Sequence, residues 1–373
     1  MKALKVDKVF LGIVGALVVV GLFVFISASL GILAKNETKF YGVLTSQLMG
    51  LGAGIVAGYI AFRIPYTFWK KYSLYLFIGS LILTFLVFVP GLGFSHGGAQ
   101  RWISLGFISF QPAEFLKLSF LMYAAAWLSY IKNKIHDARF SVMPFLGMLL
   151  VIALVLLRQP DTKSLILIFA CGIVMFFVSG LNLKYLAWIV GIGIIGFAVL
   201  VMFKPYLLER VKTFMDPSHD PRGSSYQIQQ SLIAIGSGGI FGRGFGQSIE
   251  KFSYLPEPQG DSIFAVVGEE FGFIGTVTIV VLFVAFALRG LRIANRAPDM
   301  FSRLLVTGIV ILFITQSFLN IAALVGIFPL TGVPLVFVSH GGTSLMFALA
   351  GIGIILHISQ FQKSGHLALK EKS

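Results

Sequence analysis

The residues whose types and spacing could do chemistry are concentrated in one short stretch, residues 254–273, between long apolar segments. Pro256 and Pro258 keep the backbone extended just before Asp261, and a run that reads as a helix begins at Ser262. An aspartate at such a junction is either an N-cap, which stabilises a helix by about 1 kcal/mol, or a fixed, partly dehydrated carboxylate that can accept a proton. The stretch holds four of the fifteen acidic residues of the chain, which are Glu257, Asp261, Glu269 and Glu270.

A second group of charged residues lies near the predicted ends of other apolar runs. Glu114 and Lys117 are three residues apart, so they share one face of a helix. They form a salt bridge that neutralises itself, or they face a cavity, because ionisable residues at membrane depth are costly in lipid. The two readings are compatible. Asp161 follows the turn 158–160 and is predicted to cap the helix that begins at residue 162.

These charged groups predict a site for a phosphate-bearing substrate. With the topology given below, Arg101, Glu114, Lys117, Asp161 and Asp261 all lie near one face of a membrane. Cations there could hold a phosphate, while a carboxylate acts as a base or as a metal ligand. We expect Arg101, Glu114, Lys117 and Asp261 to line one outward-facing, water-filled pocket.

Other motifs exclude several kinds of site. The glycine-rich segment 236–246 is not a nucleotide loop, because the chain has no Gly-Lys dipeptide and no strand-loop-helix pattern frames these glycines. We expect them to form turns and close packing at the membrane surface. The six histidines are scattered, so no zinc site built by the protein is visible. The single cysteine, Cys171, lies in an apolar run and is predicted to be a small buried apolar residue.

The composition predicts an all-α polytopic membrane protein with about ten transmembrane helices. Of the 373 residues, 57% are hydrophobic and 12% are charged, whereas about 25% of a soluble domain is charged. A helix needs about 20 apolar residues to cross a bilayer, and the first run is too long for the core of a signal peptide, so it should remain as an anchor. The spans are predicted at residues 9–31, 40–62, 72–90, a fourth opened by 111–114, then 142–157, 162–180, 184–203, 262–288, 304–325 and 342–361.

The distribution of basic residues predicts the orientation of these spans. With the N-terminus in the cytoplasm, seventeen Lys and Arg residues fall on the inner side and six fall in short outer segments. The other six lie in the long outer segment 204–251, and long loops count little in this rule. Cytoplasmic loops of membrane proteins carry such an excess, so both termini are predicted to be cytoplasmic. The net charge of +14 is therefore a topology signal and does not indicate nucleic-acid binding.

The chain is predicted to form a single domain, residues 1–373, with one large extracytoplasmic loop between the seventh and eighth helices. This loop covers residues 204–261, so Asp261 is its last residue. The last outer loop, residues 326–342, contains Ser339 and is apolar but irregular. It should therefore lie against protein or in the interface, and not in lipid.

Ordered motifs cover nearly the whole chain, most clearly from residue 98 onward. They are residues 98–103 (GAQRWI), 111–114 with Lys117, 159–161, 226–227 with 230–232, 236–239, 254–257 with Asp261, and Asn320, Gly326, Pro329, Gly332, Pro334 and 339–344. On these motifs the chain resembles the SEDS family (shape, elongation, division and sporulation). Residues 242–248 are more similar to those of the division type, FtsW, than to those of the elongation type, RodA.

The resemblance implies a ten-helix enzyme of the bacterial cytoplasmic membrane that polymerises lipid II into glycan strands during cell division. Asp261 matches the essential aspartate of the family and is the predicted catalytic residue. The resemblance also implies a class B penicillin-binding protein and other division proteins as partners, and a divalent metal ion (Mg or Mn) as a helper with unknown ligands. The predicted substrate-binding residues are Arg101, Gln111, Glu114, Lys117, Asp161, Glu257 and Ser339.

Other functions stay open on the sequence. Inverted repeats and charges at the midplane would favour a lipid II flippase, but no clear internal repeat is visible and the charges gather on one side. A scaffold would not need Asp261, and an elongation-type polymerase would share the same chemistry. Three residues depart from the family pattern: Gln259 stands where a histidine is common, Lys163 where a glycine is usual, and His340 where a tyrosine is usual.

Overall fold

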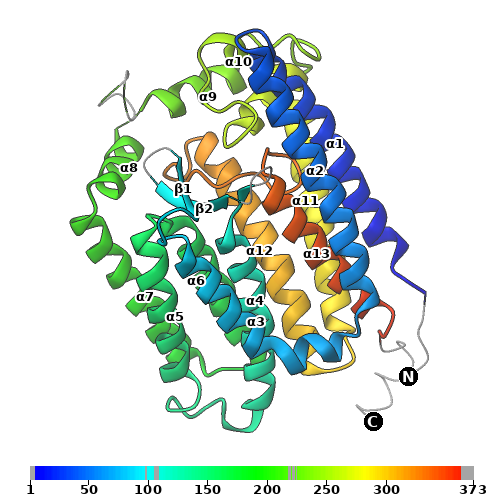
Figure 1. The fold of residues 1–373 in the computed structure, drawn as a ribbon, viewed down its shortest axis with the longest axis vertical. Helices are drawn as coiled ribbons and strands as arrows, with labels where there is room; N and C mark the ends of the chain where they lie inside the picture. Colours follow the sequence, from blue (N-terminus) through cyan, green and yellow to red (C-terminus); the bar gives the residue numbers. More distant parts are fainter. Residues whose placement is uncertain are drawn as a thin grey trace.

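A bundle of long helices forms the body of the molecule (Figure 1). The computed structural model describes residues 5–96, 99–104, 109–216, 220, 223 and 225–362, so Gly98 of the first motif and parts of the predicted loop 204–261 lie outside the described residues. The long helices are α1 (Lys8–Leu33), α2 (Glu37–Arg63), α3 (Tyr66–Leu86), α4 (Pro112–Tyr130), α5 (Val142–Arg158), α6 (Thr162–Ser179), α7 (Leu183–Phe203), α11 (Ile263–Asn295), α12 (Met300–Leu324) and α13 (Gly342–Ser359).

Each predicted span overlaps one of these helices, although α3 begins six residues before the predicted span 72–90 and α11 extends seven residues beyond the predicted span 262–288. Seven of them, α1, α2, α6, α7, α11, α12 and α13, are long and apolar enough to cross a membrane, and α5 is a shorter apolar helix. Local sequence sets several helix ends, because Asp7 and Asn36 accept hydrogen bonds from the first turns of α1 and α2. At the other end of α6, Gly180 adopts the left-handed conformation that commonly stops a helix.

The centre of the bundle is α12, which is the most buried of the spanning helices and packs against α4, α6 and α11. In contrast, α7 buries only Ile189. The closest helix pair is α2 with α13, where glycines let the two backbones approach. A Cβ on Gly50 would lie 2.3 Å from the Cα of Gly342, and one on Gly353 would lie 2.1 Å from the carbonyl oxygen of Gly58.

Short elements cover one end of the bundle, which we call the Asp261 end. They are α8 (Pro205–Met215), α9 (Tyr226–Ser237), α10 (Glu250–Ser253) and an antiparallel sheet of β1 (Gly93–His96), β2 (Ala99–Ser104) and β3 (Ser109–Phe110). In Figure 1 these elements lie in the upper half of the view, while α1 begins and α13 ends in the lower half. The sheet was not predicted from the sequence, because strands of two to six residues carry too little periodicity.

The helix α11 is interrupted at Gly272, whose φ of 60° and ψ of −156° define a conformation that essentially only glycine adopts. We call residues 263–271 its first half and residues 273–295 its second half. The break frees backbone groups on both sides, and the glycine-rich segment 239–244 satisfies four of them. The hydrogen bonds, donor first, are Arg243–Glu269, Gly244–Glu270, Phe273–Gly239 and Ile274–Ile240, at 2.9–3.2 Å. This confirms that the glycines form turns and close packing.

Candidate functional site

The side chain of Asp261 does not cap a helix. The first half of α11 begins at Ile263, its N-cap is Ser262, and no side chain makes a cap hydrogen bond there. The capping interpretation of Asp261 is therefore wrong. Its carboxylate forms no hydrogen bond or ion pair with any residue of the described part of the chain, and it is partly exposed. It is thus a carboxylate with oxygens available for another molecule.

The backbone around Asp261 is held firmly from two other elements. On α12, Asn320 Nδ2 donates to the carbonyl oxygen of Asp261 at 2.7 Å. From the loop before α13, Ser339 Oγ donates to the carbonyl of Gly260 at 2.7 Å. In that same loop the amide of His340 donates to the carbonyl of Gln259, also at 2.7 Å. The main chain at Asp261 is therefore fixed, while its carboxylate oxygens are available to accept a proton. A positioned base requires both.

Two cations donate hydrogen bonds to the loop between α12 and α13, which lies against the Asp261 carboxylate. The loop approaches closely at Gly332, where a Cβ would be 3.1 Å from Asp261 Oδ2 and 3.6 Å from Arg210 Nη2. Arg210 of α8 donates to the carbonyl of Thr331 at 2.9 Å, and Lys163 of α6 donates to the carbonyl of Gly332 at 2.5 Å. A carboxylate from the segment just before α11 and two cations from α8 and α6 thus converge on this loop.

Arg210 was not predicted from the sequence as a site residue. The available signal was its place on α8, an amphipathic segment inside the predicted outer loop. Lys163 was noted only as a departure from the family pattern, because nothing in the local sequence shows that its side chain reaches residue 332.

Glu114 and Lys117 form the predicted salt bridge, at 2.9 Å, and Lys117 Nζ also donates to Gln316 Oε1 at 3.2 Å. They line a cavity of about 10 Å³, which is room for about one water molecule. Neither Arg101 nor Asp261 lines this cavity. This cavity therefore brings together only two of the four residues that were expected to share a pocket, because side chains of α4, α12 and α13 enclose the pair.

Arg101 points toward the turn between α5 and α6. Its Nε donates to the carbonyl of Gln159 at 3.0 Å, and its Nη2 donates to the carbonyl of Pro160. Asp161, which is fully buried, caps α6 as predicted and accepts a hydrogen bond from Ser164 Oγ at 2.7 Å. These contacts tie β2 to the turn that carries Lys163, and a substrate contact for Arg101 or Asp161 stays a prediction.

The remaining predicted residues have different environments. Gln111 precedes α4 and makes no side-chain cap hydrogen bond. Glu257 is exposed and accepts a hydrogen bond from Gln259 Nε2 at 3.0 Å. Ser339 is buried, and its hydroxyl bridges Gly260 and the amide of Leu335. The structure therefore groups Glu257 and Ser339 with Asp261, and it leaves Gln111 beside the Glu114 helix turn.

The residues around Asp261 do not make a metal site. Within the described residues, no three His, Cys, Asp or Glu side chains lie close enough together to hold a metal ion. The groups that share the loop next to Asp261 are the cations Lys163 and Arg210, which repel a further positive charge. The donor set therefore does not fit a divalent ion held by the protein, and the ion implied by the family resemblance stays untested.

Comparisons with known proteins give consistent matches over the whole chain. A family model described as "Cell cycle protein", covering FtsW, RodA and SpoVE, matches residues 7–364. Stage V sporulation protein E of Bacillus subtilis is 38% identical over 317 residues, which is 85% of this chain and 87% of that protein. A probable peptidoglycan glycosyltransferase FtsW of Trichlorobacter lovleyi is 38% identical over 368 residues, covering 98% of this chain and 96% of that protein.

Solved structures agree with these sequence matches. A chain from a peptidoglycan synthase complex that coordinates polymerization and crosslinking has a TM-score of 0.77 at 28% identity, covering 95% of this chain and 98% of that one. The rod shape determining protein RodA of Thermus thermophilus has a TM-score of 0.70 at 26% identity, covering 96% of this chain and 98% of that one. The similarity extends over the bundle and the Asp261 end together.

Proposed function

The chain belongs to the FtsW/RodA/SpoVE family, and we infer that it is a multi-pass peptidoglycan glycosyltransferase of the bacterial cytoplasmic membrane that polymerises lipid II into glycan strands. The observation that carries the site assignment is the free carboxylate of Asp261 beside Gly332, with Lys163 and Arg210 on the same loop. A base and a pair of cations are the groups that glycosyl transfer from a lipid diphosphate needs.

In the proposed reaction, Asp261 accepts the proton of the acceptor sugar hydroxyl as the hydroxyl oxygen attacks the anomeric carbon of the donor. The new C–O bond forms while the bond from that carbon to the diphosphate oxygen breaks, and the lipid diphosphate leaves with the electron pair. A diphosphate is already a good leaving group, so positioning and charge neutralisation contribute much of the rate.

Lys163 and Arg210 are assigned to the negative charge that develops on the leaving diphosphate. Fixed cations stabilise such charge without reorganising during the reaction. Within the described residues, both side chains donate to backbone carbonyls of residues 331 and 332, contacts that a charged phosphate oxygen can replace with a stronger hydrogen bond. From the sequence this role was predicted for Arg101 and Lys117. Arg101 donates to the α5–α6 turn and Lys117 pairs with Glu114, and a diphosphate contact for either stays a prediction. No step passes through a metal ion.

We place the Asp261 end on the outer face of the membrane, on the basis of the distribution of Lys and Arg. The partner is a class B penicillin-binding protein that crosslinks the strands, which is supported by the likeness to a chain of a peptidoglycan synthase complex. We propose that the polymerisation takes place during cell division, since the relative matched over 98% of this chain is a probable FtsW.

The test is Asp261→Asn in purified protein supplied with lipid II. Since Asp261 caps nothing, the variant should keep its melting temperature, while the loss of a positioned base lowers polymerisation by about 10²–10⁴-fold. Glu209→Gln, an exposed carboxylate on α8, is the control and should polymerise normally.

An active Asp261→Asn variant would remove Asp261 from the chemistry, and Glu257 would be the next candidate. Lipid II movement in sealed vesicles without polymer formation would favour the flippase instead.

A further inference from the structure

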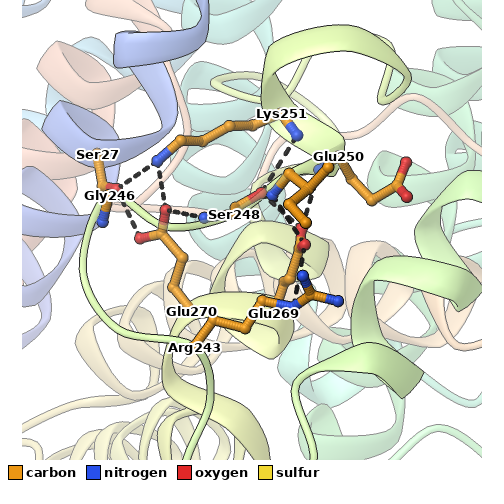
Figure 2. A network of polar contacts seen from close by, with 9 residues as sticks. Ser27, Arg243, Gly246, Ser248, Glu250, Lys251, Glu269 and Glu270 are labelled. Atoms are coloured by element: carbon orange, nitrogen blue, oxygen red, sulfur yellow. Dashed lines mark hydrogen bonds and ion pairs between the residues drawn. The ribbon is translucent and has the colours of Figure 1, made fainter.

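Two fully buried carboxylates of α11, Glu269 and Glu270, take no part in the proposed reaction. Figure 2 shows them at the centre of a network that joins α11 to α1 and to the segment around α10. Glu270 forms an ion pair with Lys251, whose side chain is also fully buried. Ser27 of α1 donates to Glu270 Oε2 at 2.5 Å and accepts from Lys251 Nζ at 3.1 Å and from the amide of Gly246 at 3.2 Å.

The neighbouring carboxylate, Glu269, collects donors from the start of α10. Ser248 Oγ donates to it at 2.5 Å, the amide of Ile249 at 2.9 Å and the amide of Glu250 at 3.3 Å. Arg243 Nε lies 3.6 Å from Glu269 Oε1. Carboxylates that accept several amide hydrogen bonds are held in one place, so the two glutamates bind residues 243–251 tightly to the end of the first half of α11.

These contacts close a loop in the chain. Residues 248–251 and residues 269–270 are joined side by side, and the segment between them runs out to Asp261 and returns through the first half of α11. The break at Gly272 separates this half from the rest of α11. The position of the first half is therefore determined by the closed loop and by the contacts of residues 259–261 with α12 and the last loop.

We propose that this closed loop, residues 248–270, positions the catalytic carboxylate, and that Lys251 and Glu270 are positioning residues for Asp261. The inference rests on the proposed function of Asp261. It assigns to the buried ion pair an effect on the rate of the chemical step. Substrate binding is left unchanged, because the cations assigned to the diphosphate lie on α6 and α8, outside the loop.

The chain offers a matched control on the same two helices. At the opposite end of α11, Arg289 donates to both carboxylate oxygens of Asp7, which caps α1, at 2.9–3.0 Å. This ion pair also joins α1 to α11, but the second half of α11 separates it from Asp261. A purely structural role for the ion pairs predicts the same functional result at both ends.

The experiment compares two double variants that each remove both charges of a pair, Lys251→Met with Glu270→Gln, and Asp7→Asn with Arg289→Met. Removing both charges avoids an unpaired buried charge, which would destabilise the fold by itself. For each purified protein, kcat and KM for lipid II are measured per folded molecule, together with the melting temperature.

The positioning role predicts that the Lys251/Glu270 variant loses about 10- to 100-fold in kcat, as displacement of about 1 Å can cause, with KM unchanged. The Asp7/Arg289 variant should keep kcat. Equal kcat values for the two variants, or a change confined to KM, would overturn the proposal. Lys251→Arg, which keeps the ion pair, should retain most of the wild-type kcat.

A milder variant covers the case in which the Lys251/Glu270 variant does not fold. Ser27→Ala removes three hydrogen bonds of the network and leaves both charges, so kcat should fall severalfold at an unchanged KM. A wild-type kcat for Ser27→Ala would then refute the proposal. If Asp261→Asn is inactive while the network variants are fully active, only the positioning inference fails; if Asp261→Asn is active, the proposed function fails first.

Discussion

The two halves of α11 are one helix in the sequence but two different parts of the molecule. In the first half, every residue from Ile263 to Glu270 is buried, and two of them are carboxylates. In the second half, Phe273, Val281 and Leu288 are each more than half exposed, as expected for a face toward lipid. The first half is thus enclosed by protein and can hold charges, while the second half is an apolar membrane anchor.

The ion pairs at the two ends show the same contrast. Lys251 and Glu270 are both fully buried and lie in a network of further donors. Arg289 is about a quarter exposed opposite Asp7. A buried charge is tolerated only where partners surround it, and at the first half these partners come from the glycine-rich segment and α10. The comparison teaches that residues 243–251 make a polar site possible at the end of an apolar helix.

Gly272→Ala should remove the difference between the halves, and we expect it to have a larger effect than the substitutions of charged residues that follow. The positive φ alone costs a non-glycine residue about 1–3 kcal/mol, and a Cβ would lie 2.4 Å from the amide nitrogen of Gly242 and 2.6 Å from the carbonyl oxygen of Ile240. The segment 239–244 would have to leave the break. We expect a clearly lower melting temperature and no polymerisation of lipid II.

The control for this change is Gly15→Ala in α1, where a Cβ would meet nothing within 4 Å. Alanine is the better helix former, so this variant should be as stable and as active as the wild type. An active Gly272→Ala variant would show that the break is not needed for the site.

Arg210→Ala tests whether Asp261, just before the first half of α11, works together with cations from other helices. A charged hydrogen bond to a phosphate is worth about 1.5–3 kcal/mol, so kcat/KM for lipid II should fall by about 10- to 100-fold. Lys163→Gly should act in the same direction. Lys212→Ala, on the same helix as Arg210 but paired with Glu209, should leave kcat/KM unchanged. Equal losses for Arg210→Ala and Lys212→Ala would indicate a general charge effect and not a local contact.

Glu250→Gln should have the smallest effect of these substitutions. It tests how burial and the nearby Glu269 affect a carboxyl group packed against the first half of α11. Burial raises the pKa of the Glu250 carboxyl above its ordinary value, and the nearby Glu269 raises this pKa further, while Arg243 lowers it. The ionised form is therefore disfavoured in the folded state. Above the folded pKa the wild type bears this cost and the variant does not, so the variant should melt slightly higher at neutral pH.

The advantage of Glu250→Gln should disappear as the pH falls through the folded pKa toward the unfolded value, because the wild-type carboxyl is then protonated as well. Melting curves across this range measure it. A variant that melts lower than the wild type at neutral pH would show that the Glu250 charge is stabilising.

The sequence alone determined the features that depend on neighbouring residues. The apolar runs predicted the helices, Asp161 was predicted to cap α6, and Cys171 was predicted to be buried; the structure confirms each of these. Caps, turns and apolar periodicity arise from interactions over a few residues, so a single sequence is sufficient to show them. The motif match to the SEDS family likewise needed no structure, and it predicted Asp261 as the catalytic residue before any contact was known.

Only the tertiary structure decided which charged residues lie close together. Lys163, Arg210 and Asp261 come from three elements separated by dozens of residues, and they meet because the loop at Gly332 runs between them. The sequence predicts a continuous helix through Glu269 and Glu270. It does not show that the helix is interrupted at Gly272 or that Lys251 packs against Glu270. Such contacts depend on how separate helices and loops pack, because the energy of a buried charge is set by the groups around it in space and not by its neighbours along the chain.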